Sequence, residues 1–266
     1  MLPLQVEEYH IGQLYSVSEA SKNETGGGEG IEVLENRPFK DTEFPNDVPP
    51  GREGQYTHKI YHLANKVPRF VRLIAPKGAL EVHEHSWNCY SWCKTVICNP
   101  DYMKEAFHVT IVSMHVENDR GELENVHDLS PEQLEDRVLV PIDIVNDQID
   151  QRDYSEEVDP KLFHSEKTGR GPYKKDWKET TDPIMCAYKL VTCQFKWWGL
   201  QGRVEKMIMN AEKRVFTKFH REVCCWIDQW YGLTLEDIRK IEEETKQILV
   251  EQRHDPHRSI RGYSEA

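Results

Sequence analysis

The sequence predicts an α+β fold, in which a large, curved, mostly antiparallel sheet is combined with long helices. Strand candidates bounded by Gly, Pro, Asn or Asp follow one another along the first three-quarters of the chain, at residues 31–39, 55–63, 79–85, 93–98, 107–117, 137–145 and 184–197. Helical periodicity flanks them, at residues 4–20, 201–230 and 235–253. Because strands are grouped and do not alternate with helices, an α/β fold is not expected.

The two C-terminal helices are the most strongly patterned segments. Residues 201–230 carry a wide apolar stripe, which includes Val204, Met207, Ile208, Val215, Phe219, Val223, Trp226 and Trp230. Gly232 is expected to end this helix, and Thr234 with Asp237 to cap the next one. The interval 146–183 is polar and predicts a long irregular connection.

Composition and charge exclude several classes of function. No stretch approaches the ~20 apolar residues that span a bilayer, and the N-terminus lacks the pattern of a signal peptide. The 7 cysteines are an odd number, and a chain of 266 residues needs no disulfide staples. We therefore expect a cytoplasmic protein. A net charge of −12 argues against nucleic-acid partners and against permanent adhesion to anionic membranes, but it allows brief membrane visits.

The candidates for catalysis and metal binding are weak. Cys224 and Cys225 follow His220 by one helical turn, but they lie in the stripe that packs the core and are expected to be small buried hydrophobes. His83 and His85 share a strand face, yet no further ligands are spaced as in a zinc site. No hydrolase, metalloprotease or dinucleotide motif is present. We expect no enzyme activity, no catalytic residues, no metal and no cofactor.

Two lysines lie on strand faces that also carry apolar residues. Strand alternation places Lys189 with Ala187, Val191, Cys193, Phe195 and Trp197, and Lys59 with Thr57, Tyr61 and Leu63. A lysine facing a sealed core would cost several kcal/mol unless it were paired. Either these side chains extend to the rim of the sheet, or they indicate a pocket for an acidic or polyhydroxyl group.

Two segments are candidates for membrane contact. Trp197 and Trp198 end a strand before Gly199, so they either close a core or insert at a membrane interface, which indoles favour. The segment 67–76 is apolar, bracketed by prolines and interrupted by two arginines. A loop that touches anionic headgroups has this composition.

Long blocks of the sequence resemble the class I phosphatidylinositol transfer proteins, namely residues 21–30, 54–62, 167–172, 186–192, 195–201 and 242–246. The likeness runs from about Leu2 to about Arg253. It implies one phosphatidylinositol-transfer domain over residues 1–253 and a flexible tail over 254–266. It also implies a START-like helix-grip fold, in which the sheet and two long helices enclose a lipid cavity. Two departures from the family pattern are Ser113, where threonine is common, and a longer loop at 40–54.

The resemblance also assigns roles to individual residues. The inositol ring would be held by Thr57, Lys59, Asn88 and Glu242. The phosphate region that phosphatidylinositol shares with phosphatidylcholine would be surrounded by Gln13, Cys93, Thr95, Ser113 and Lys189. Membrane docking would fall to Trp197, Trp198, Phe70, Val71, Leu73 and Ile74. Ser165 matches a family phosphorylation site.

The resemblance thus implies a non-enzymatic carrier that exchanges phosphatidylinositol for phosphatidylcholine between membranes and supports phosphoinositide supply. We expect a lipid-loaded monomer in the cytoplasm with transient association with Golgi- or ER-type membranes, and a nuclear location stays open. Three alternatives remain: a START-like carrier of sterol or ceramide, a lipid hydrolase using Cys93 or Cys224, and an adaptor presenting lipid to kinases.

Overall fold

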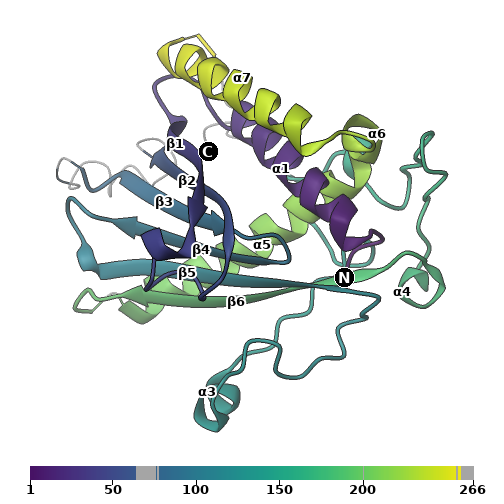
Figure 1. Cartoon of the computed structure of the whole chain (residues 1–266), viewed down its shortest axis with the longest axis horizontal. Coiled ribbons are helices and arrows are strands. Elements are labelled where there is room, and N and C mark those ends of the chain that lie inside the picture. The colour runs from purple at the N-terminus through teal and green to yellow at the C-terminus, as the bar shows by residue number, and fades with distance from the viewer. Residues whose placement is uncertain (64–75, 77, 200, 256, 259–266) are drawn as a thin grey trace. The chain divides into compact units, whose positions relative to one another are not determined.

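The protein is an α+β molecule with one open antiparallel sheet, as the sequence predicts (Figure 1). A computed structural model describes residues 1–63, 76, 78–199, 201–255 and 257–258. The six strands are hydrogen-bonded in chain order, β1 (Gly30–Lys40), β2 (Glu53–His62), β3 (Glu81–Asn88), β4 (Trp92–Asn99), β5 (Lys104–Glu117) and β6 (Met185–Phe195). The helices are α1 (Val6–Asn23), α3 (Pro131–Asp136), α4 (Trp177–Thr180), α5 (Gln201–Cys225), α6 (Ile227–Trp230) and α7 (Leu235–His254). Over these residues no helix is both long and apolar enough to cross a membrane.

Two predicted elements differ from the structure. The strand expected at 137–145 is wrong, because that segment is irregular and follows α3. Val138 and Leu139 are 83% and 74% exposed, so a strand here would not bury their apolar side chains. Pro141 also has no N–H to donate to a neighbouring strand. The helix expected at 201–230 is divided into α5 and α6 by Trp226, whose backbone has φ −91° and ψ 11°.

The residues group into two compact units that divide several elements between them. The first unit comprises Met1–Ser16, Ser113–Leu190 and Met209–Ile238. Its core contains Tyr9, Trp177, Trp230 and Ile227. Gly12 on α1 allows a close approach, since a Cβ there would lie 2.8 Å from the Trp230 indole.

The second unit comprises Val17–Val112, Val191–Ile208 and Arg239–Ala266, and it holds strands β1 to β4. Within it, α7 is tied to β1 by an ion pair between Arg253 and Glu32. Glu32 also contacts the His62 ring at 3.0 Å. The hydrogen bond from Arg253, which outweighs the opposing effect of burial, lowers the pKa of Glu32 to about 2. The C-terminal turn of α7 is therefore held to the sheet by charge as well as by packing.

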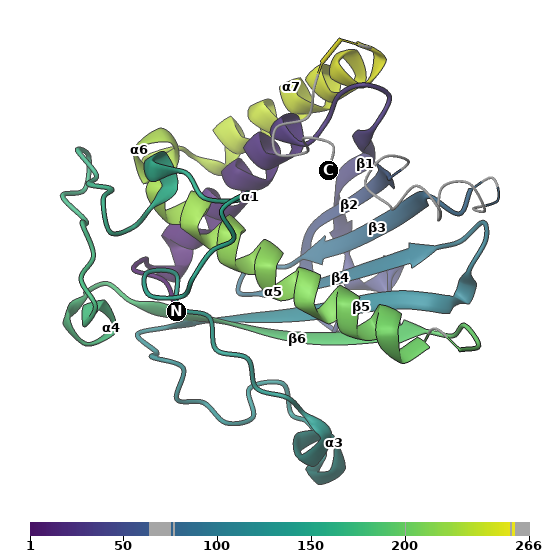
Figure 2. The same ribbon diagram turned by 180° about the vertical axis from the view of Figure 1, so that it is seen from behind.

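Helix α5 contacts strand β6 within each of the two units; both elements are labelled in the view from behind (Figure 2). In the first unit the Lys189 ammonium of β6 lies 5.1 Å from the centre of the Phe216 ring of α5. In the second unit the Phe195 backbone N–H donates to the Glu205 carboxylate at 3.0 Å. Each unit thus contains its own contact between this helix and this strand.

Candidate functional site

Most of the predicted headgroup residues of the second unit lie on one face of β2, β3 and β4. In the register of the sheet, Thr57 is opposite Ser86, which is itself opposite Thr95, and Asn88 is opposite Cys93. Cross-strand partners point to the same face, and so do alternate residues of one strand. Thr57, Lys59, Asn88, Cys93 and Thr95 therefore share this face, which we call the polar face.

Lys59 is held on the polar face by a carboxylate that sequence reasoning missed. Its ammonium lies 3.2 Å from the Glu84 carboxylate, and the two side chains are only 12% and 14% exposed. The Tyr61 hydroxyl donates to the other Glu84 oxygen at 2.6 Å. Because Lys59 and Glu84 are directly opposite each other on β2 and β3, the pair follows from the register. The lysine charge is thus compensated and its position fixed.

Glu242 approaches the same face from α7. Its carboxylate accepts a hydrogen bond from Asn36 of β1 at 2.9 Å and one from Arg239 at 2.6 Å. Asn36 is opposite Thr57 and accepts from the Gln55 amide at 2.7 Å, so it belongs to the polar face. The structure therefore brings all four predicted inositol-binding residues to one side of the second unit. Asn36 and Gln55 were missed: the signal for Gln55 was its position two residues before Thr57 on the same strand, whereas Asn36 is brought to Thr57 only by the register of β1 and β2.

The hydroxyls and the thiol on β3 and β4 form a short polar row. The Ser86 hydroxyl lies 3.0 Å from the Thr95 hydroxyl and 3.6 Å from the Cys93 sulfur. These three groups can donate or accept by rotating their hydrogens. Such groups adapt to a polar ligand without any change of backbone.

In the first unit, Ser113 and Lys189 are brought together. Ser113 is buried on β5, and the Lys189 ammonium donates to its hydroxyl at 3.3 Å. The Phe216 ring covers the same ammonium on another side. Gln13, the remaining predicted phosphate residue, is half-buried on α1 in this unit. The five residues predicted to surround the phosphate are thus divided between the two units, because Cys93 and Thr95 belong to the second unit.

His115 is a second residue that sequence reasoning missed. It follows Ser113 by two positions on β5 and so shares its face. Burial, together with the charge of Lys189, lowers the pKa of His115 to about 3, and its buried Nε2 atom has no hydrogen-bond partner among the residues that the structure describes. A neutral imidazole with an unsatisfied nitrogen therefore lies on the face of Ser113, near a lysine charge.

Cys224, the candidate nucleophile of the hydrolase alternative that lies in this unit, is not activated as a thiolate. Cys224 is buried, and burial raises its pKa to about 12, which keeps the thiol protonated. His220, the imidazole one turn away, has its Nε2 atom 3.0 Å from the Tyr9 hydroxyl and its Nδ1 atom 2.7 Å from the Phe216 carbonyl. Cys224 and Cys225 are small buried side chains, as expected.

The two tryptophans predicted to dock on membranes are arranged differently from each other. Trp197 is 41% exposed and stacks on Phe195, with ring centres 6.3 Å apart and an interplanar angle of 11°. Trp198 is 98% exposed. One indole therefore rests on the sheet while the next projects into solvent. The other predicted docking residues, Phe70, Val71, Leu73 and Ile74, lie outside the residues that the structure describes.

Ser165 is fully buried and hydrogen-bonded. Its hydroxyl donates to the Asp228 carboxylate at 2.5 Å and lies 2.7 Å from the Thr168 hydroxyl. The backbone N–H groups of Glu166 and Lys167 donate to the same carboxylate. Burial opposes ionisation, but these hydrogen bonds lower the pKa of Asp228 below its ordinary value. A kinase can reach this hydroxyl only if the segment around it opens.

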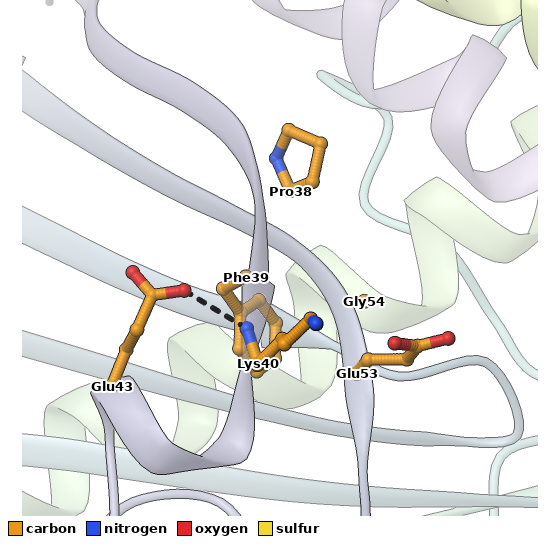
Figure 3. A pocket seen from close by; sticks show the side chains of 6 residues that line it. All are labelled: Pro38, Phe39, Lys40, Glu43, Glu53 and Gly54. Atoms are coloured by element: carbon orange, nitrogen blue, oxygen red, sulfur yellow. Dashed lines mark hydrogen bonds between the residues drawn. The ribbon is translucent and has the colours of Figure 1, made fainter.

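A surface hollow of about 590 Å³ lies where strand β1 ends and strand β2 begins (Figure 3). It is lined by Pro38, Phe39, Lys40, Glu43, Glu53 and Gly54. None of these six is a predicted headgroup residue, so the candidate site is the polar face and not this hollow.

Comparison with known proteins identifies the class of molecule to which this fold and polar face belong. The sequence model of the family described as phosphatidylinositol transfer protein matches residues 1–247. The chain therefore belongs to this family of lipid transfer proteins, which are not enzymes. The beta isoform of phosphatidylinositol transfer protein from Mus musculus is 53% identical over 272 residues, covering 100% of this chain and 96% of that protein.

Two other relatives differ in how much of their own length is matched. Phosphatidylinositol transfer protein 1 of Dictyostelium discoideum is 46% identical over 251 residues, covering 94% of this chain and 91% of that protein. Membrane-associated phosphatidylinositol transfer protein 2 of Homo sapiens is 43% identical over 254 residues, but the match covers only 18% of that protein. The full-length match to the beta isoform agrees with membership of class I.

Proposed function

We propose that this chain binds one phosphatidylinositol or phosphatidylcholine molecule in an internal cavity, transfers it between membranes and thereby supports phosphoinositide supply. One observation carries the proposal. Thr57, Lys59, Asn88 and Glu242 are gathered on one side of a single unit, where they offer a hydroxyl, an ammonium, an amide and a carboxylate. An inositol ring presents hydroxyl groups that all four can engage.

Discrimination between the two lipids follows from this chemistry. Choline has no hydroxyl or N–H group, so it gains no hydrogen bond from these four side chains. A site built to hydrogen-bond a substrate hydroxyl rejects an analogue that lacks it, because the site's own polar groups are left unpaired. The pairs Lys59–Glu84 and Asn36–Glu242 limit this penalty, since they satisfy part of the site in the absence of inositol. Both lipids can therefore bind, with phosphatidylinositol favoured at this position.

The phosphate common to both lipids is assigned to a second group of residues. Lys189 supplies a positive charge, and the hydroxyl of Ser113 lies 3.3 Å from it. Gln13, Cys93 and Thr95 would add neutral donors around the phosphate. His115 is a further candidate, because its unsatisfied imidazole nitrogen lies on the face of Ser113. Binding through this group is shared, so its loss would affect both lipids alike.

The acyl chains explain why transfer needs a protein. Two chains carry roughly 30 methylene groups, each worth about 0.8 kcal/mol on leaving hydrocarbon for water. The total exceeds roughly 20 kcal/mol, which prevents useful spontaneous exchange. An apolar cavity removes most of this cost. An empty cavity of that size would be unstable, so we expect the protein to hold a lipid between membranes.

Membrane contact would be brief. Trp198 is 98% exposed and supplies an indole that can insert among headgroups. The net charge of −12 opposes lasting adhesion to an anionic surface. We therefore assign the chain to the cytoplasm, from which it would visit Golgi- or ER-type membranes. It would act there as a lipid-loaded monomer, without a cofactor, metal-dependent chemistry or a nucleic-acid partner. Residues 1–253 would act as one transfer domain, with the family's docking loop around Phe70, Val71, Leu73 and Ile74.

Ser165 is proposed as a phosphorylation site of the folded carrier. Its hydroxyl is buried against Asp228, so a phosphate there would place two anions side by side. Phosphorylation would therefore require opening of residues 165–170 and would keep them open.

Vesicle transfer tests the function directly. The purified full chain is mixed with donor vesicles containing labelled phosphatidylinositol or phosphatidylcholine and unlabelled acceptor vesicles, and co-purified lipid is identified by mass spectrometry. The proposal predicts transfer of both lipids and their presence in the purified protein. Sterol or ceramide as the bound lipid, with neither phospholipid transferred, would contradict it and favour the other START-like carriers.

A further inference from the structure

Three histidines meet on the face of the sheet opposite the polar face. His58 of β2 is directly opposite His85 of β3, and His83 is diagonal to His58 on the same side. One nitrogen from each ring can be chosen so that all three atoms lie within 4.8 Å of one another. The sequence predicted no metal site here, because His58 is distant in sequence from the other two and only the register brings it to them.

The distances are close to those of a metal site. The His58 Nε2 atom lies 2.9 Å from the His83 Nδ1 atom, so these two nitrogens share one proton. Two imidazoles on a tetrahedral zinc ion have nitrogens about 3.4 Å apart, because each Zn–N bond is about 2.1 Å. The His58 and His85 rings are stacked, with centres 4.2 Å apart, so coordination of one ion by both requires the rings to rotate about their side-chain bonds.

The surroundings of the cluster also suit a cation. The Tyr56 hydroxyl lies 2.8 Å from the His85 Nδ1 atom, and metal-bound histidines commonly have such a second partner, which fixes the ring. Glu35 of β1 is directly opposite His58, and its carboxylate is paired with the Arg37 guanidinium at 3.2 Å, so it contributes only part of its charge to the cluster. All three histidines are half-buried, so solvent ions can reach them and water can complete the coordination.

We propose that His58, His83 and His85 bind one first-row divalent transition-metal ion, with zinc as the representative, on the outer face of β2 and β3. Imidazole nitrogens are ligands that Zn²⁺, Cu²⁺ and Ni²⁺ prefer over Mg²⁺ or Ca²⁺. On binding, the ring that donates between His58 and His83 changes tautomer: its proton moves through solvent to the other nitrogen of the same ring, so that both imidazoles stay neutral and each presents a lone pair to the ion. The ion links two neighbouring strands and lies on the side of the sheet away from Thr57 and Lys59.

Calorimetric titration with Zn²⁺ alone tests this site. The full chain is prepared without a histidine tag, stripped of metal by chelation and kept reduced, because seven free cysteines are a competing source of zinc ligands. We expect one ion per chain. His85→Gln and His58→Gln should each weaken binding at least about tenfold, and Tyr56→Phe, which keeps the ring but removes the second partner, should weaken it about tenfold.

His108→Gln is the matched control, since it removes a histidine of β5 outside the cluster and should bind zinc as the wild type does. Circular dichroism establishes that each variant is folded, and an unfolded variant is replaced by His83→Gln. Absence of zinc binding by the wild type would overturn the proposal. Binding that persists unchanged in both His85→Gln and His58→Gln would overturn it too, since it would place the ion on cysteines or elsewhere. Transfer of phosphatidylinositol should be the same for His85→Gln and wild type, so the test does not depend on the lipid proposal.

Discussion

Replacing Lys59 is the most informative single perturbation, but the structure shows that it has two effects. Lys59→Ala removes a proposed inositol contact and also leaves the Glu84 carboxylate without its cation, in a position only 14% exposed. Breaking a fully buried pair by removing one partner costs about 3–5 kcal/mol. Tyr61 still donates to Glu84 at 2.6 Å, so we expect a loss of stability below that range, about 2–3 kcal/mol.

Glu84→Gln separates the two effects when it is combined with Lys59→Ala. The double variant has no unpaired carboxylate, so it should recover about 1–2 kcal/mol of the lost stability in urea unfolding. It still lacks the charged donor to inositol, which is worth about 1.5–3 kcal/mol. Since 1.36 kcal/mol is a factor of about ten, phosphatidylinositol transfer should fall roughly ten- to a hundredfold relative to phosphatidylcholine transfer.

Labelled-lipid transfer between vesicles, run for both lipids on the same protein preparations, supplies the ratio. The reasoning requires the stability of the double variant to recover while the lipid ratio stays shifted. If the lipid ratio returned to the wild-type value together with stability, Lys59 would serve the fold and not the headgroup. Glu84→Gln alone keeps the ammonium but removes the carboxylate that positions it, so it measures how much of any change in the lipid ratio comes from losing that partner.

Three other predictions concern membrane docking, acid stability and modification. Trp198→Ala should leave the urea midpoint unchanged, because the indole is 98% exposed, and should lower vesicle binding about tenfold; Trp197→Ala should also cost stability, because that ring stacks on the sheet. Burial lowers the pKa of His115 to about 3, so the unfolded chain binds this proton below pH 6.5 and the folded chain does not. Stability should therefore fall as the pH drops from 6.5 toward 3, by up to about 1.36 kcal/mol per pH unit, and His115→Gln should show a shallower slope in urea titrations at several pH values. Ser165→Glu should destabilise the chain by about 2 kcal/mol or more, because its carboxylate would be buried beside Asp228, whereas Ser165→Ala should cost about 1 kcal/mol; equal unfolding midpoints for the two variants would contradict this.

The sequence predicted the arrangement within each strand better than the pairing between strands. Alternation placed Lys189 on an apolar strand face, and the structure joins it to the buried Ser113 hydroxyl at 3.3 Å. The same reasoning noticed Lys59 but missed Glu84, because which residue stands opposite another depends on register, and register is not encoded by the pattern of one strand. The three-histidine cluster was missed for the same reason.

Two errors came from reading periodicity without tertiary context. The β-branched and apolar run at 137–145 suggested a strand, but the side chains of Val138 and Leu139 are exposed among the residues that the structure describes. The apolar stripe of 201–230 continues past Trp226 although the helix does not, because the chain turns there into α6 while Ile227 and Trp230 stay in the core. A hydrophobic pattern records burial and does not fix backbone continuity.

Thr57→Val tests the central claim most directly, because it removes one hydroxyl from the polar face while keeping the shape and β-propensity of the side chain. Loss of a neutral hydrogen bond to inositol costs about 0.5–1.5 kcal/mol, so phosphatidylinositol transfer should fall roughly two- to tenfold while phosphatidylcholine transfer stays at the wild-type rate. An equal fall for both lipids, or an unchanged ratio, would contradict the assignment of this face to the inositol ring.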